Sequence, residues 1–395
     1  LKLLREDILT TELQKVSSES QRRELYSMDW LDDKDKIIEG AFAECYLKMH
    51  PMICIHGILF TIDGIVSDES GIKNDIYSMV RPYVTSGLAR KVEQLLQTIK
   101  LEAYSEPLPL QTDRIHVANG TLFLNGEFSE QKDFCLNRLP VIYDPDVEKP
   151  ARWLKFMEEL LNPDDILTLQ EYMGYMLLPT TKAQKMMLII GKGGEGKSRI
   201  GLVLRELFGN NMYSCSLQKI EVDKFARANL EYMLITVDDD MKLEALPQTN
   251  HIKSIVTLED QIDLERKGQQ SFQGVVYARL IAFGNGGLHA LYDKTDGFYR
   301  RQLILTTKDK VDGREDDPYL IDKLRKERDG IFLWALEGLQ RLVSNNYVFT
   351  ESVDAKQNLV DAQEEGNNIL AFMKSEGYLQ FEIGKKISST DFYNI

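Results

Sequence analysis

Eight consecutive residues near the middle of the chain have the types and spacing needed to bind phosphate. They read Gly191-Lys192-Gly193-Gly194-Glu195-Gly196-Lys197-Ser198, which is the pattern G-x-x-x-x-G-K-[ST] of a P-loop. Glycines let the backbone wrap around phosphates with its N–H groups pointing inward, and the start of a following helix adds partial positive charge. In this pattern the lysine reaches the β- and γ-phosphates and the serine hydroxyl binds Mg²⁺. The residues expected to bind the nucleotide are Gly191, Gly193, Gly194, Glu195, Gly196, Lys197, Ser198 and Arg199.

A second acidic segment could supply the carboxylates that such a site needs. In "LITVDDD", Leu234 to Asp240, mostly apolar residues are followed by three aspartates. Ligands of open α/β sheets bind at the carboxyl ends of the strands, so these carboxylates are expected beside the P-loop. We assign Asp238 to Mg²⁺ and Asp239 to the activation of water. A shift by one residue, to Asp239 and Asp240, and a solvated acidic turn are the alternatives.

Two further polar positions follow along the chain. "RLIAFGN" ends in Asn285, which could contact the γ-phosphate at the tip of its strand. "DKTDGFYRRQLIL" then places Arg300 and Arg301 directly before an apolar run. An arginine delivered to a γ-phosphate by a neighbouring subunit stabilises the charge of the transition state. The alternative for this pair is a surface position at the start of a strand.

These residues need a parallel sheet to bring them together. Short apolar runs typical of buried parallel strands are found in "MMLIIG", "YMLITVDDDM", "RLIAFGN" and "RRQLILTT", and a helix is expected from Lys197 to Phe208. Strands that alternate with helices indicate an α/β fold with a central parallel sheet.

The segments on both sides of this α/β region have different sequence patterns. Residues 1–100 have mainly helical periodicity, interrupted by the β-rich "ICIHGILFTIDGIV", and "RIHVANGTLFLNGEF" predicts a hairpin at its Asn-Gly dipeptides. "ARWLKFMEELL", "DDILTLQEYMGYML" and the segment after Pro318 predict helices, and the final residues are expected to begin a small module. We therefore expect an accessory domain over 1–150, a helical linker over 151–185, the ATPase core over 186–310 and a helical segment over 311–395.

In this order the motifs resemble the superfamily 3 helicases of the AAA+ class, in particular the primase-helicases of phage, plasmid and poxvirus type. The resemblance rests on the P-loop, the acidic strand end, "IKSIVTLEDQIDLERKGQQSFQ", the strand ending in Asn285, and the pattern D-x-T-x-G-x-x-R-R. "GIFLWALEGLQRL", residues 330–342, resembles the closing helix of that family. The similarity spans about residues 40–350 and includes the helical and hairpin region before the P-loop.

The resemblance implies a β-hairpin that carries basic residues into the pore of a ring. Lys253 would precede this hairpin, and Arg266 and Lys267 would lie on it or at its tip. All three are expected to contact DNA, and a solvent-exposed helix end is the alternative. The chain departs from the family at Leu258-Glu259-Asp260, where Gly-Gly-Asp is common, and after Asn285, where a proline is common. Both departures concern the boundaries of the hairpin.

The function that this resemblance implies is an ATP-dependent, DNA-stimulated helicase for the replication of a mobile element. ATP and Mg²⁺ would be its cofactors, single-stranded or forked DNA its substrate, and a ring, in the first place a hexamer, its assembly. Priming activity is not expected from these residues, and any primase domain would lie in sequence that precedes them. The alternatives are a non-translocating AAA+ initiator or loader and, less favoured by the paired arginines, a small-molecule kinase.

The composition limits the remaining possibilities. The chain has 395 residues, 43% hydrophobic and 28% charged, with a net charge of −14, which disfavours a general nucleic-acid coat. Residues 251–310 have a slight basic excess. No apolar run is long enough for a membrane span, no signal peptide pattern is present and the first residue is Leu1, so we expect part of a longer cytoplasmic protein of a bacterial host. Cys45 and Cys54, with two nearby histidines, lack the usual zinc spacing and are expected in the core.

Overall fold

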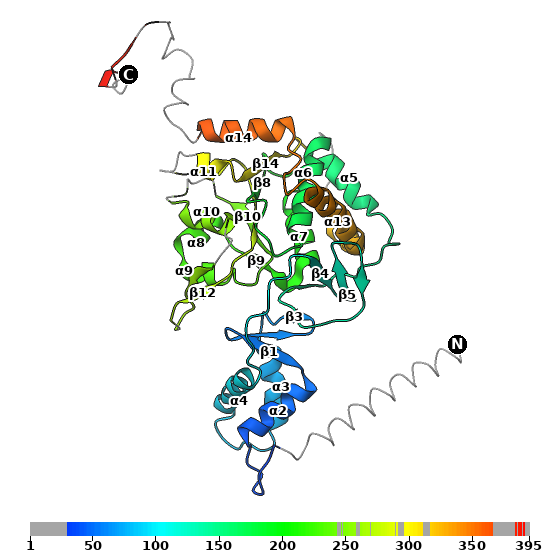
Figure 1. The fold of residues 1–395 in the computed structure, drawn as a ribbon, viewed down its shortest axis with the longest axis vertical. Helices are drawn as coiled ribbons and strands as arrows, with labels where there is room; N and C mark the ends of the chain where they lie inside the picture. The colour runs from blue at the N-terminus through cyan, green and yellow to red at the C-terminus, as the bar shows by residue number, and fades with distance from the viewer. Residues whose placement is uncertain are drawn as a thin grey trace, which may run out of the picture. The chain divides into compact units, whose positions relative to one another are not determined.

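The protein forms two compact units (Figure 1). The computed structural model describes residues 30–242, 246, 248–257, 261–268, 270–288, 290, 296–310, 317–365, 384, 386–388 and 390–391. The smaller unit comprises Leu1–Pro109 with Asp133–Leu136, and the larger one Leu110–Lys132 with Asn137–Ile395. The boundary therefore falls about forty residues before the expected position at residue 150, because the predicted hairpin after residue 110 packs with the larger unit. The segments predicted before residue 30 and most of those after 365 lie outside the described residues.

From residue 30 onward, the smaller unit combines the helices α2, α3 and α4 with an antiparallel sheet of order β1-β2-β3. Its core consists of apolar side chains from the helices and the first two strands, among them Phe42, Tyr46, Ile76 and Leu95. This arrangement confirms the expected short strands between helices. The elements are α2 (Glu39–Met49), β1 (Met52–Ile55), β2 (Ile58–Thr61), β3 (Gly64–Ile65), α3 (Ser70–Val80) and α4 (Leu88–Glu102).

The larger unit begins with a four-stranded sheet of order β6-β5-β4-β7. Its hairpin pairs Val117 with Gly120, so the turn consists of Ala118 and Asn119, and the glycine of the predicted Asn-Gly dipeptide is already the first residue of the next strand. The strands are β4 (Arg114–Val117), β5 (Gly120–Phe123), β6 (Phe128–Ser129) and β7 (Arg138–Leu139).

The main sheet of the larger unit has five parallel strands in the order β14-β8-β13-β10-β9. The four strands expected from apolar runs are present. The fifth, β9, was not predicted, since three residues give no periodic signal. The strands are β8 (Met186–Ile190), β9 (Met212–Ser214), β10 (Ile235–Met241), β13 (Arg279–Gly284) and β14 (Gln302–Thr306).

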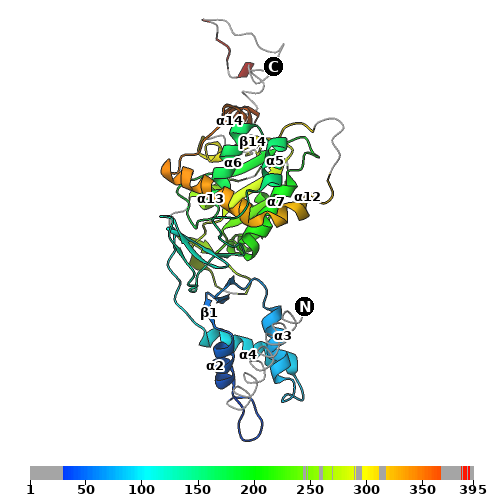
Figure 2. The same cartoon turned by 90° about the vertical axis from the view of Figure 1, so that its right-hand side faces the viewer.

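Helices cover both faces of this sheet (Figures 1 and 2). Met187 and Ile189 of β8 belong to one apolar core, with α6, α7 and α13, whereas Met186 and Leu188 belong to the other, with α8 and α10. A strand that is buried on both faces explains the continuous apolar run. The helices are α5 (Ala151–Leu160), α6 (Pro163–Tyr175), α7 (Ser198–Phe208), α8 (Leu217–Val222), α9 (Lys224–Ala228), α10 (Asn250–Thr257), α11 (Asp296–Tyr299), α12 (Leu320–Lys326), α13 (Arg328–Ser344) and α14 (Val353–Glu365), with a 3₁₀ turn at Gly209–Asn211.

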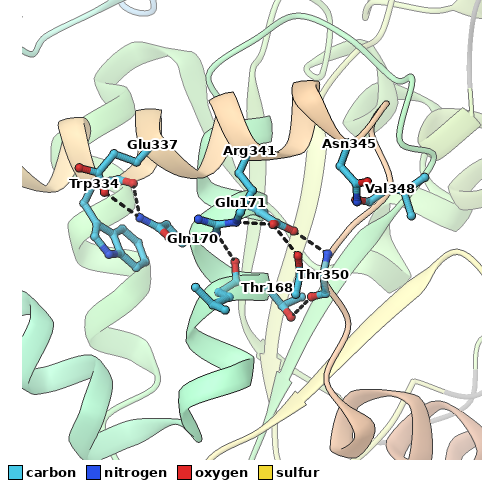
Figure 3. A network of polar contacts seen from close by, with 10 residues as sticks. Thr168, Gln170, Glu171, Trp334, Glu337, Arg341, Asn345, Val348 and Thr350 are labelled. Carbon is cyan, nitrogen blue, oxygen red and sulfur yellow. Dashed lines mark hydrogen bonds and ion pairs between the residues drawn. The ribbon is translucent and has the colours of Figure 1, made fainter.

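The helix before the P-loop strand packs closely against the helix that follows the sheet. A Cβ on Gly338 of α13 would lie 2.2 Å from the carbonyl oxygen of Gln170 in α6, so only glycine permits this approach. Next to this contact, the buried carboxylate of Glu171 accepts hydrogen bonds from Arg341 Nε at 2.6 Å and from Thr350 N at 2.7 Å (Figure 3). These contacts join α6, which precedes the sheet in the sequence, and α13, which follows it, into one layer.

An antiparallel pair of short strands lies in the segment where the resemblance implied a hairpin. These strands are β11 (Ile262–Leu264) and β12 (Phe272–Gly274).

Among the described residues, no helix combines the length and the apolar character that a bilayer span requires.

Candidate functional site

The P-loop connects the carboxyl end of β8 to the start of α7. Gly193, Gly194 and Gly196 have φ angles of 111°, 87° and 110°, a region that side chains disfavour, so the loop can turn sharply. The loop borders a cleft of about 520 Å³. Its lining consists of Gly193, Gly194, Glu195, Gly196, Lys197, Ser198, Arg199, Leu202, Asp239, Asp240, Phe283, Gly284, Asn285, Asp317 and Leu320.

Lys197 lies at the centre of the polar contacts in this cleft. Its side chain is 8% exposed, and its Nζ lies 2.8 Å from Glu195 Oε2 and 3.5 Å from Asn285 Oδ1. Asn285 therefore meets the P-loop, since β13 lies between β8 and β10 in the sheet. Only glycine fits at position 191, because a Cβ there would lie 2.1 Å from Thr307 Oγ1 and 3.0 Å from Lys197 Nζ.

Glu195 turns its carboxylate inward, into the loop. Its Oε1 accepts a hydrogen bond from Gly193 N at 2.6 Å, in addition to the contact of Oε2 with Lys197. Burial by itself would raise the pKa of this carboxyl. The hydrogen bonds from Lys197 and from the backbone outweigh burial, and they hold the pKa below its ordinary value.

Asp238 does not line the cleft. Its Oδ2 accepts a hydrogen bond from Leu217 N at 2.9 Å, at the start of α8 on the opposite face of the sheet. Burial raises the pKa of this carboxyl, and the neighbouring aspartates add to the rise. The structure therefore places the Asp238 side chain at the start of α8 and not in the cleft, and its role as the Mg²⁺ ligand stays a prediction that this placement disfavours.

Asp239 and Asp240 line the cleft instead. Successive side chains of a strand point to opposite faces, so Asp239 lies on the face of β10 that packs against α7. Its Oδ1 lies 2.6 Å from the position that a Cβ on Gly201 would take. Partial burial raises the pKa of Asp239, whereas Arg205 opposes the rise. The placement favours the alternative that shifts the acidic pair by one residue.

The donors in the cleft fit a magnesium-bound triphosphate. Mg²⁺ is usually held by one or two carboxylates together with phosphates and water, and Ser198, Asp239 and Asp240 offer such oxygens at one end of the loop. Gly193 N, Lys197 Nζ and the start of α7 offer the donors that phosphates need. In the described part of the chain, no group of three or more His, Cys, Asp or Glu side chains could hold a metal ion.

Arg300 and Arg301 lie at the amino end of β14, away from the P-loop of the same chain. The carbonyl of Arg301 accepts a hydrogen bond from Met186 N at 2.8 Å, so both arginines flank the amino end of β8, whereas Gly191 follows its carboxyl end. Five strand residues at about 3.3 Å each separate the two ends by roughly 16 Å. The Arg301 guanidinium donates to Gly297 O, whereas the Arg300 side chain is 62% exposed and lies 3.9 Å from Asp296.

The basic residues of the hairpin segment are also in different environments. Arg266 pairs with the buried carboxylate of Glu231, and its guanidinium carbon lies 4.8 Å from the centre of the Phe272 ring. Lys267 is exposed in the turn between β11 and β12, and Lys253 lies half-buried on α10. Arg266 therefore anchors the hairpin, and the expected role in DNA contact stays a prediction chiefly for Lys267.

Two residues at the start of α12 were missed by sequence reasoning. Asp317 and Leu320 form a wall of the cleft, although they follow the P-loop by more than a hundred residues. Asp317 is bonded to Lys323 at 2.7 Å. Their segment carries no motif, so only the packing of α12 against α7 could reveal them.

Comparisons with known proteins agree with this architecture. Residues 189–301 match the model of a family of unknown function, DUF5906. The chain is also similar to solved apo structures of the NrS-1 C-terminal region. For the structure of residues 305–718, the TM-score is 0.55 at 12% identity, covering 81% of this chain and 74% of that one. An A-form structure of the same residues gives 0.53 at 11% identity, with 81% and 74% covered. At these identities the likeness establishes a shared fold: a mixed α/β structure with a central parallel sheet.

Proposed function

We propose that this chain is an ATP-hydrolysing DNA helicase motor that works as a ring of the superfamily 3 type. The observation that carries the proposal is the division of polar residues between the two ends of the parallel strands. A triphosphate-binding cleft lies at the carboxyl ends, and the exposed Arg300 lies about 16 Å away at an amino end. Arg300 can therefore act on a γ-phosphate only in another subunit.

The residues of the cleft have complementary roles in this proposal. Bound Mg-ATP supplies the phosphoryl group that is transferred to water. Lys197 and the backbone N–H groups of the loop bind and orient the phosphates, and Ser198 with Asp239 or Asp240 offers oxygens to Mg²⁺. The second aspartate of the pair orients the attacking water. Asn285, 3.5 Å from Lys197 Nζ, positions the lysine and senses the γ-phosphate.

Contact with DNA is proposed for the hairpin of β11 and β12. Arg266 holds the hairpin on Glu231, and Lys267 is exposed in its turn, where a lysine can neutralise a phosphate of single-stranded DNA. Glu231 lies four residues before the start of β10, the strand that carries Asp239. Movement at the nucleotide cleft can reach the hairpin through this strand.

The test combines hydrolysis, assembly and strand displacement on the full chain. We expect ATP turnover that single-stranded DNA stimulates, a ring-sized mass by light scattering, and release of a labelled strand from forked DNA. Lys197→Ala should abolish turnover, because the phosphates lose their central cation. A strictly monomeric protein whose hydrolysis ignores DNA would contradict the motor. Assembly with ATP but without strand displacement would favour the initiator or loader.

A further inference from the structure

The P-loop contains an acidic side chain that the phosphate-binding motif does not require. Glu195 occupies one of the variable positions of the pattern, yet its side chain is only 4% exposed. Its two carboxylate oxygens contact Gly193 N at 2.6 Å and Lys197 Nζ at 2.8 Å. Of the four carboxylates that line the cleft, those of Glu195, Asp239, Asp240 and Asp317, that of Glu195 is the one within the loop.

Both donors that Glu195 uses are donors that a P-loop offers to phosphate oxygens. The loop backbone supplies N–H groups and the lysine supplies a cation. A carboxylate matches these donors because it is an anion with two acceptor oxygens, and hydrogen bonds between charged partners are the stronger ones. A phosphate group and the Glu195 carboxylate cannot occupy the same position.

We propose that Glu195 is a built-in competitor for the phosphate cradle: its carboxylate takes the place of a phosphate on Gly193 N and Lys197, and a triphosphate must displace it to bind. The residue therefore sets the nucleotide affinity of the site. This inference rests on the proposed nucleotide site and adds a control on it. A nucleotide succeeds because its phosphates offer more negative charge and more acceptor oxygens than one carboxylate does.

The competition has a defined kinetic signature. When the binding-competent form of a site is a minor fraction, the apparent dissociation constant rises by the inverse of that fraction. For a loss of one charge-assisted contact we expect a change of about tenfold. In this proposal the carboxylate leaves its two donors before the phosphates bind, as an equilibrium within the free protein. The competitor should therefore lower the association rate and leave the dissociation rate nearly unchanged.

The experiment measures binding rather than hydrolysis on the full chain. The variants are Glu195→Gln, which keeps the size but removes the charge, and Glu195→Ala, which removes the acceptor atoms as well. Glu206→Gln is the matched control: it removes the same charge from α7, but its partner is Arg325, outside the cleft. The probes are Mg²⁺ with AMP-PNP and Mg²⁺ with inorganic tripolyphosphate, by titration calorimetry, and a fluorescent ATP analogue by stopped flow.

We expect both Glu195 variants to bind both probes about tenfold more tightly, through faster association, and the control to match the native chain. Unchanged or weaker binding in both variants would overturn the competitor and indicate that Glu195 instead holds Lys197 in place. If the affinities are equal but ATP hydrolysis responds to DNA, the competitor fails and the motor stands. If tripolyphosphate binding tightens but AMP-PNP binds to no variant, the motor fails and the competitor stands.

Discussion

The two ends of the parallel strands use charged residues in different ways. At the carboxyl ends the groups converge: Lys197 contacts both Glu195 and Asn285, and the last two aspartates of β10 line the same cleft. Toward the amino ends the basic residues occur as adjacent pairs, and the two members of each pair have different environments. Arg301 bonds a carbonyl and Arg266 pairs with a buried glutamate, whereas their neighbours are exposed.

This difference distinguishes a site that one chain assembles by itself from side chains that it presents to another molecule. The carboxyl ends of neighbouring parallel strands meet at one edge of a sheet, so residues from distant segments share a site. Two adjacent residues point in different directions, so one member of a basic pair is used internally while the other faces outward. Identical residue types in a pair are therefore expected to have separable roles.

The largest effect that would test this division concerns the arginines before β14. Arg300→Ala should lower turnover by about 10³-fold or more, the range reported for an arginine that acts on a γ-phosphate. Mixed with Asp239→Asn subunits, it should regain part of the activity, since an intact Arg300 then faces an intact cleft. Turnover in mixtures of varied ratio is the measurement. Arg301→Ala should lose thermal stability and show no such recovery. If no mixture regains activity, the site is not shared.

A smaller effect distinguishes the aspartates at the end of β10. Asp239→Asn should lower turnover by about 10²–10⁴-fold while AMP-PNP still binds, because a carboxylate that holds Mg²⁺ or orients the attacking water is lost. Asp238→Ala should instead leave Leu217 N without its acceptor and lower the free energy of unfolding by about 1–3 kcal/mol. Single-turnover hydrolysis and urea unfolding separate the two. A greater loss of turnover in Asp238→Asn than in Asp239→Asn would restore the first assignment.

The smallest effect concerns the hairpin. Lys267→Ala should weaken the stimulation by single-stranded DNA a few-fold and reduce the slope of log affinity against log salt by about 1, as expected for one phosphate contact. Arg266→Ala should act on stability, because it leaves Glu231 buried without its cation, at a cost on the order of a few kcal/mol. Anisotropy titrations at several salt concentrations measure the first effect. Equal loss of hydrolysis with and without DNA in Lys267→Ala would indicate a folding defect instead.

Much of the central architecture could be predicted because its signals are local. The apolar runs that became β8, β10, β13 and β14 need no long-range information, since strands buried on both faces are apolar throughout. The hairpin of β4 and β5 was likewise predicted from its Asn-Gly dipeptide, although its turn lies one residue earlier, at Ala118-Asn119. By contrast, β9 has three residues, which is too short for a periodic signal, and only its pairing with β10 identifies it as a strand.

The position of the P-loop was predicted from the sequence alone, because the pattern G-x-x-x-x-G-K-[ST] is typical of a loop between a strand and a helix. Which aspartate faces that loop was decided by tertiary structure: a shift of one residue along a strand turns a side chain to the other face, and only the packing of β10 against α7 fixes the choice. The same holds for Arg266, whose partner Glu231 is 35 residues away in the sequence, so that contact exists only once the two segments have packed together. Glu195 and Arg301 contact groups within four residues, but their contacts depend on the backbone conformation that the loop and the short helix adopt in the folded chain.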